Sequence, residues 1–210
     1  MKAIIFSLLG WMFLPVMDGF AKFLSTDLPI LQITWAIYFF TVVFTLPIMF
    51  FFFNKQLVWS DKPKLQILRG LILLSANICF FYSISIISLA KALTLAFIAP
   101  LIVTAFSPLF LGEKVGFIGS LVVIRPGFVE LNIASFAALC TGFFYGFYLI
   151  ITRKLSTSDN PLLTLLMTGL VGAILVSLVV PFYWVKPTLN QWSLMAGIGV
   201  FACIGHFFLI

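Results

Sequence analysis

The chain has 210 residues, of which 63% are hydrophobic and only 9% charged, and its net charge is +6. This composition excludes a water-soluble fold, because a compact soluble domain must cover its surface with more polar side chains. It also argues against a nucleic-acid-binding protein, since the Lys and Arg residues stand singly or in small groups between apolar stretches and form no continuous basic face.

Apolar stretches of membrane-spanning length fill the sequence. Each is close to the ~20 residues with which an α-helix crosses a bilayer. The alternating pattern of a membrane β-barrel is missing from runs such as 50–53 and 170–180. The sequence therefore predicts an all-α integral membrane protein, with spans at residues 3–21, 29–53, 70–90, 92–111, 131–152, 161–185 and 189–210.

The first stretch also resembles a secretory signal peptide, with Lys2 before an apolar region. Asp18 interrupts the place where a cleavage site with small residues is expected. We therefore interpret this stretch as a true span.

The distribution of positive charge predicts the orientation. With a cytoplasmic N-terminus, three Lys and Arg residues lie outside (Lys91, Arg125 and Lys186), and Lys22 lies near the outer end of the first span. The cytoplasmic side then has eight: Lys2, Lys55, Lys62, Lys64, Arg69, Lys114, Arg153 and Lys154. This bias indicates a multi-pass protein of the cell membrane, as in a bacterial inner membrane, with its N-terminus in the cytoplasm.

The segment between Lys114 and Arg125 is too short to span. Its ten residues, 115–124, reach only ~15 Å as a helix, which is half the hydrocarbon layer. If this segment does not cross, the later charged residues exchange sides and the count stays at eight against three. The sequence leaves its topology open.

The chain contains an internal repeat. The block from Lys22 to Leu31 corresponds to the block from Arg153 to Leu163, with Ser158 as a one-residue insertion. In both copies the block joins two apolar stretches, the first joint outside and the second inside. We therefore expect two repeats of opposite orientation, residues 1–130 and 131–210, which is a common framework for transport by alternating access.

Several motifs together resemble the drug/metabolite transporter superfamily, specifically its ten-helix EamA-type members. They are Asp18 with Lys22, the stretch 32–38, Ala99-Pro100, Leu111-Gly112-Glu113, Arg125-Pro126-Gly127 and Gly205-His206. The resemblance covers essentially the whole chain and implies inverted five-helix repeats that enclose a solute pathway.

Three departures from the family pattern stand out. Ile37 occupies a position of the second helix where members usually have Arg. The fifth helix is shortened by about ten residues, and the last two helices are missing. The expected fold is thus truncated to about seven full transmembrane helices plus one short helix.

Asp18 and Lys22 lie one helical turn apart, with the acid first, which favours pairing. Asp18 is the one carboxylate well inside a span, so it is the candidate for proton or cation coupling. Structurally, Lys22 would extend to the outer interface and hold Asp18.

Trp35, Tyr38, Asn77 and Tyr82 place polar groups within the second and third spans. They are candidates for a substrate cavity suited to a flat or partly apolar metabolite. The alternative is that they bond neighbouring helices and contact lipid.

Pro15, Pro100 and Pro108 lie within expected helices, where each frees a backbone carbonyl. At Pro100 the carbonyl of Ala96 would face a central cavity, which the resemblance also implies, or the proline only bends the helix. Glu113 follows this helix, and capping of the next helix is its expected role.

Gly142 and Gly146 predict a close helix contact, with a neighbour in the same chain or in a second subunit. Tyr145 and the single histidine, His206, are candidates for the cavity. The three cysteines, Cys79, Cys140 and Cys203, are interpreted as small buried apolar residues.

The expected function is that of a secondary carrier for a small organic metabolite or drug. Its partners would be the solute, the bilayer and, as an oligomer, further copies of the chain, with no nucleic acid, metal or cofactor. One alternative is a non-functional or scaffold-like fragment of such a carrier. A membrane-embedded enzyme is disfavoured, because no Ser or Cys nucleophile stands near a His base at a recognisable spacing.

Overall fold

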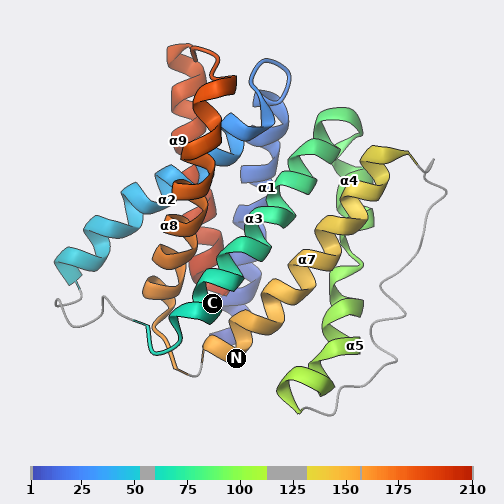
Figure 1. Ribbon diagram of the computed structural model, residues 1–210, viewed down its shortest axis with the longest axis vertical. Coiled ribbons are helices and arrows are strands. Elements are labelled where there is room, and N and C mark those ends of the chain that lie inside the picture. The colour runs from blue at the N-terminus through green and yellow to red at the C-terminus, as the bar shows by residue number, and fades with distance from the viewer. Residues whose placement is uncertain (1, 53–59, 113–131, 157, 210) are drawn as a thin grey trace.

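The computed structural model describes residues 2–52, 60–112, 132–156 and 158–209. Within these ranges every regular element is a helix, which confirms the all-α prediction (Figure 1). The elements are α1 (Lys2–Leu24), α2 (Ile30–Phe52), α3 (Pro63–Ile86), α4 (Leu89–Ala96), α5 (Ala99–Leu111), α7 (Ile133–Leu155), α8 (Pro161–Val179), the 3-10 helix η2 (Val180–Tyr183) and α9 (Leu189–Leu209).

Among the described residues, six segments are long and apolar enough to cross a membrane: α2, α3, α4 together with α5, α7, α8 together with η2, and α9. Helix α1 adds a seventh element of 23 residues. Large apolar side chains on the outside of the bundle, such as Phe50, Leu109 and Phe182, are more than 70% exposed. Such a surface suits lipid, because apolar side chains cover it without a polar shell.

Local sequence signals set several helix ends. The Asn132 side chain accepts a hydrogen bond from the Ser135 backbone (2.8 Å), and Asn160 accepts one from the Leu162 backbone (2.9 Å). Both asparagines satisfy backbone donors that the first helical turn leaves free. Gly112 ends α5 with a φ of 69°, a conformation that side chains rarely adopt.

The fourth span is interrupted rather than bent. Helix α4 ends at Ala96 and α5 starts at Ala99, with Pro100 in the first turn of α5. A proline is well tolerated there, because that turn has no backbone acceptor for its missing N–H group. The prediction that Pro100 lies inside a continuous helix is therefore wrong.

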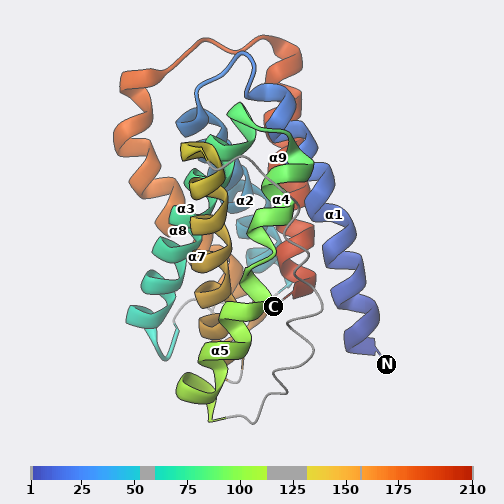
Figure 2. The same cartoon turned by 90° about the vertical axis from the view of Figure 1, so that its right-hand side faces the viewer.

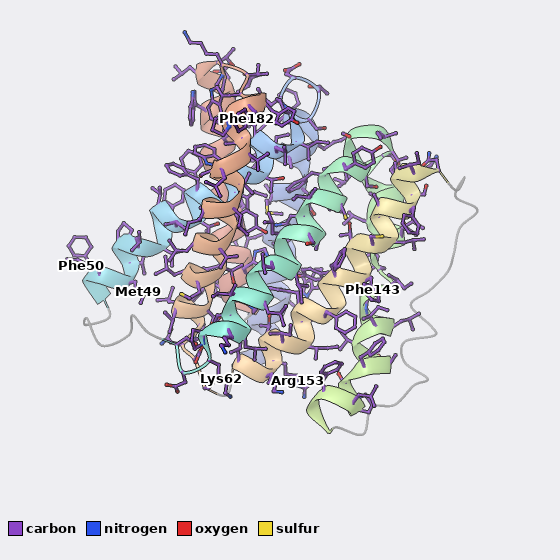
Figure 3. All side chains as sticks on the ribbon, in the orientation of Figure 1. Met49, Phe50, Lys62, Phe143, Arg153 and Phe182 are labelled. Carbon is purple, nitrogen blue, oxygen red and sulfur yellow. The ribbon has the colours of Figure 1, made fainter. Side chains whose placement is uncertain are left out.

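The bundle is built from helix pairs that lie far apart in sequence. Helix α1 runs beside α9, α2 beside α8, and α3 beside α7, and α4 and α5 cover the outer side of α7 (Figures 1 and 2). The α1–α2 turn and the α7–α8 turn lie at opposite ends of the bundle. Lys62 and Arg153 lie at the same end of the bundle (Figure 3).

Several expectations fall on residues outside the described ranges: the segment 115–124, Glu113, the motif Arg125-Pro126-Gly127, and the positions of Lys55 and Lys114. The start of the expected span 70–90 needs correction, because α3 begins at Pro63, so Lys64 and Arg69 are helical residues.

The small-residue face of α7 contacts helices of the same chain. A Cβ atom at Gly142 would lie 2.5 Å from the carbonyl oxygen of Ala96, and one at Gly146 would lie 2.7 Å from the side chain of Ile102. The close contact predicted for the two glycines is therefore confirmed, and its partner is the α4–α5 segment rather than a second subunit.

Candidate functional site

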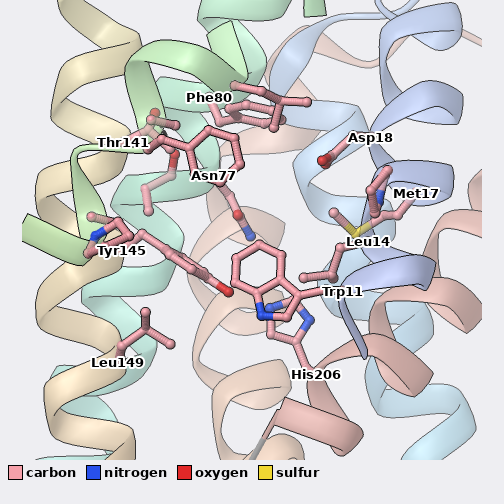
Figure 4. A pocket seen from close by; sticks show the side chains of 17 residues that line it. Trp11, Leu14, Met17, Asp18, Asn77, Phe80, Thr141, Tyr145, Leu149 and His206 are labelled. Atoms are coloured by element: carbon pink, nitrogen blue, oxygen red, sulfur yellow. Dashed lines mark hydrogen bonds between the residues drawn. The ribbon is translucent and has the colours of Figure 1, made fainter. Parts of the chain in front are cut away.

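A cavity of about 240 Å³ lies between α1 and α9 on one side and α3, α4, α5 and α7 on the other. Most of its wall is apolar, formed by residues such as Leu14, Met17 and Phe80 (Figure 4). Five of the residues predicted as candidates line it: Asp18, Asn77, Pro100, Tyr145 and His206. Residues from both halves of the sequence thus meet around one cavity.

Asp18 is only 7% exposed, and its side chain faces this cavity from α1. Lys22 does not pair with it within the part of the chain that the structure describes. The Lys22 ammonium instead donates hydrogen bonds to the carbonyl oxygens of Ile84 and of Ile87 (3.3 Å), at the end of α3. The expected structural pairing is therefore wrong, because the carbonyls at the end of α3 bind the cation.

Tyr145 and His206 approach the cavity from α7 and α9. The hydroxyl of Tyr145 points toward the rings of Trp11 and His206 (Figure 4). The Tyr145 hydroxyl and Nε2 of His206 are buried and have no hydrogen-bond partner among the described residues. His206 Nδ1 lies 2.9 Å from the carbonyl oxygen of Ala202, so the backbone of α9 holds the ring. Two orphaned polar atoms thus border one apolar space.

Tyr38 lies next to this cavity rather than in its wall. Its hydroxyl accepts a hydrogen bond from the Asn77 side chain (2.9 Å). Tyr38, Asn77 and His206 also line a second cavity of about 20 Å³. Tyr38 therefore positions Asn77 at the boundary between the two cavities.

Two predicted candidates lie elsewhere. The Trp35 indole donates a hydrogen bond to Ser177 (2.9 Å) and packs against Trp184, in an open hollow between α2 and the end of α8. Tyr82 is 37% exposed on the outer surface of α3. For both residues the structure matches the alternative of helix contacts and lipid exposure.

The sequence-based selection missed a buried arginine. The Arg69 side chain is fully buried between α3, α7 and α8. Its guanidinium donates to Thr152 (2.7 Å), to the hydroxyl of Thr168 (2.6 Å), to the carbonyl of Thr164 (3.0 Å) and to the hydroxyl of Tyr148 (2.8 Å). The charge pattern of the sequence places Arg69 only among the cytoplasmic positive charges. The available signal was its place directly before Gly70 at the start of an apolar stretch.

A second polar cluster lies at the end of the bundle that carries Arg153. The Asp159 carboxylate accepts hydrogen bonds from Ser60 and from the Gln66 amide (2.6 Å). Gln66 also donates to Thr164 (3.1 Å). Every one of these contacts joins the first half of the sequence to the second, so the Arg153 end of the bundle is held closed by polar contacts between the halves.

The sequence and the fold of the chain are both similar to those of known proteins. Residues 1–124 match the model of the EamA-like transporter family. The fold is also similar to a chain of known crystal structure, with a TM-score of 0.73 at 15% identity, over 99% of this chain and 77% of that chain.

Three relatives are named as transporters. The S-adenosylmethionine uptake transporter of Rickettsia bellii is 24% identical over 91% of this chain and 70% of its own length. The pseudopaline exporter CntI of Pseudomonas aeruginosa is 28% identical over 92% and 72%, respectively. The riboflavin transporter of Vibrio cholerae is 27% identical over 55% and 43%. The chain therefore belongs to the EamA-like transporter family, within the drug/metabolite transporter superfamily, and is a membrane transporter of small metabolites.

Proposed function

We propose that this chain is a secondary carrier that moves a small organic metabolite by alternating access, with the cavity beside Asp18 as its substrate site. The observation that carries this proposal is the position of the cavity between the two halves of the sequence. Secondary carriers built from inverted repeats place their substrate sites at such an interface.

The helix pairing supports two repeats of opposite orientation, residues 1–130 and 131–210. In the repeat, α1 corresponds to α7, α2 to α8 and α3 to α9. If the two copies are exchanged, the pair α1–α9 becomes the pair α7–α3, and the pair α2–α8 stays the same. These three pairs are the ones observed in the bundle.

The polar contacts at the two ends support the same exchange. Asp27 corresponds to Asp159 in the repeat, and the first turn of α9 corresponds to that of α3. Asp27 accepts a hydrogen bond from Gln191 (3.2 Å), but this contact is exposed, whereas the one between Asp159 and Gln66 is buried. We infer that this conformation is closed at the Arg153 end. In a second conformation, the contact between Asp27 and Gln191 would be buried and the contact between Asp159 and Gln66 would be exposed.

The charge distribution supports a cytoplasmic location for the end that carries Lys62 and Arg153. In a cysteine-free background, single cysteines at Lys62 and at Arg153 are then expected to react with an impermeant thiol reagent only from the cytoplasmic face. A cysteine at Lys186 is expected to react only from the opposite face. Reaction of the Lys62 and Arg153 variants from different faces would refute the proposed topology.

The proposal assigns the chain no enzymatic activity and no nucleic acid partner, and leaves further copies of the chain as its candidate partners. The relatives are transporters by name.

A cavity-filling variant tests the proposed pathway. Ala76 is 1% exposed and lines the cavity, so we expect Ala76→Trp to block solute exchange by filling it. The measurement is counterflow of labelled S-adenosylmethionine or riboflavin, the solutes named for the relatives, in liposomes that contain the purified chain. The matched control, Ile174→Trp, adds the same ring at a position of α8 that is 61% exposed. Equal flux in the Ala76→Trp variant and the unmodified chain would show that the solute passes elsewhere.

A further inference from the structure

We infer that the substrate is a small organic cation with a flat or apolar body, bound with its positive group against Asp18. This inference rests on the proposed function, because it assigns the chemistry of the same cavity.

The first argument is the charge of the site. Asp18 is the one acidic residue of the cavity wall, and no Lys or Arg lines the cavity within the described residues. Lys22, one turn away on α1, is bound by carbonyls at the end of α3, and the buried Arg69 is bound by threonine and tyrosine oxygens. A carboxylate held in an apolar environment is costly unless a cation meets it. The positive charge that meets Asp18 therefore comes from the bound ligand.

The second argument is the composition of the remaining wall. Trp11, Phe80, Phe97 and Tyr145 provide four aromatic rings around the cavity. Trp11 and Tyr145 meet edge to face, with ring centroids 6.4 Å apart. Aromatic faces attract cations and stack against flat ligands, so both parts of the inferred ligand find a matching surface.

The third argument comes from the orphaned polar atoms. His206 is 7% exposed, yet its Nε2 has no partner in the described part of the chain, and the same holds for the hydroxyl of Tyr145. Buried polar groups normally find a hydrogen-bond partner. A polar substituent on the ligand body, such as an amide or a ring nitrogen, would satisfy both atoms.

The size of the cavity limits the ligand. About 240 Å³ is slightly below the range of about 300–1,000 Å³ that is typical of ligand pockets. The site therefore suits a metabolite with one or two rings rather than a peptide or a lipid.

The test uses pairs of ligands that share a skeleton and differ in charge. One pair is 1-methylnicotinamide, a cation, and neutral nicotinamide. The other is S-adenosylmethionine, which has a sulfonium centre, and S-adenosylhomocysteine, which lacks it. Binding to the purified full chain is measured in nanodiscs of neutral phosphatidylcholine, with empty nanodiscs as background. We expect the cation of at least one pair to bind roughly tenfold to a hundredfold more tightly than its neutral partner.

The variant Asp18→Asn keeps the shape of the side chain and removes its charge. We expect it to lose the preference for the cation while the neutral ligand binds unchanged. The control, Asp61→Asn, removes an exposed carboxylate next to α3 and should keep the preference. Thermal melting of each variant shows whether it is folded, and the comparison of ligands on the unmodified chain does not depend on any variant.

The inference is overturned if neither cation is preferred on the unmodified chain, or if folded Asp18→Asn keeps the preference. Neither result bears on the proposed function, which is judged by solute flux. Conversely, cation binding at Asp18 without any flux would leave the inference standing and refute the carrier.

Discussion

Replacement of Arg69 by alanine is expected to lower the free energy of unfolding by roughly 2–4 kcal/mol. The variant loses four hydrogen bonds from the guanidinium and leaves the hydroxyls of Tyr148 and Thr168 with fewer partners in a buried region. It also removes a large side chain that is fully buried, and the resulting space adds to the loss. The measurement is unfolding of the purified chain by SDS in mixed micelles.

Lys64 provides the matched control for this variant. It lies on the same helix, has the same charge and is exposed. We expect Lys64→Ala to change the unfolding free energy by less than about 0.5 kcal/mol. If Arg69→Ala unfolds at the same SDS concentration as the unmodified chain, the buried cluster does not stabilise the closed end.

Substitution of Gly142 by alanine is the second change with a large expected effect, a loss of about 1–3 kcal/mol. The added methyl group would lie 2.5 Å from the carbonyl oxygen of Ala96, which is a backbone atom and so cannot turn away as a side chain would. Helices α4 and α7 must therefore separate. Unfolding by SDS measures the loss.

Gly19 is the control for this substitution, because a Cβ atom there would have nothing within 4 Å. Since alanine favours the helix more than glycine does, Gly19→Ala should leave the stability unchanged or raise it by up to about 1 kcal/mol. If the Gly142→Ala and Gly19→Ala variants unfold at the same SDS concentration, the close contact between α7 and α4 is contradicted.

The spans could be predicted from the sequence because ~20 apolar residues can cross a bilayer only as a helix. The start of α3 could not, since Lys64 and Arg69 read as residues of a charged connection. In the structure Lys64 remains exposed at the helix end, whereas Arg69 is buried and bound by oxygens of α7 and α8. Those partners lie about 80 to 100 positions further along the chain, where no local pattern reveals them.

The candidate site could be predicted only in part for a related reason. A polar residue within a span usually faces the interior of the bundle or a cavity, and on this basis the sequence predicts Asp18, Asn77 and His206 as site residues. The sequence does not reveal which side of a helix faces the cavity, because apolar residues occupy all sides of these helices. Tyr82 and Asn77 lie on the same helix, for example, yet only Asn77 lines the cavity. Helix packing decides this, and it depends on both halves together.

Accessibility of the cavity from each side of the membrane tests the central claim most directly. Thr141 lines the cavity and is 7% exposed, and cysteine is smaller than threonine by one methyl group, so it fits the same position. In a cysteine-free background, alternating access predicts that Thr141→Cys reacts with a small charged thiol reagent from either face of oriented vesicles, and that a bound solute slows both reactions. A cysteine at the lipid-exposed Ile174 should react from neither face. Reaction of Thr141→Cys from one face only, or from neither, would contradict transport through this cavity.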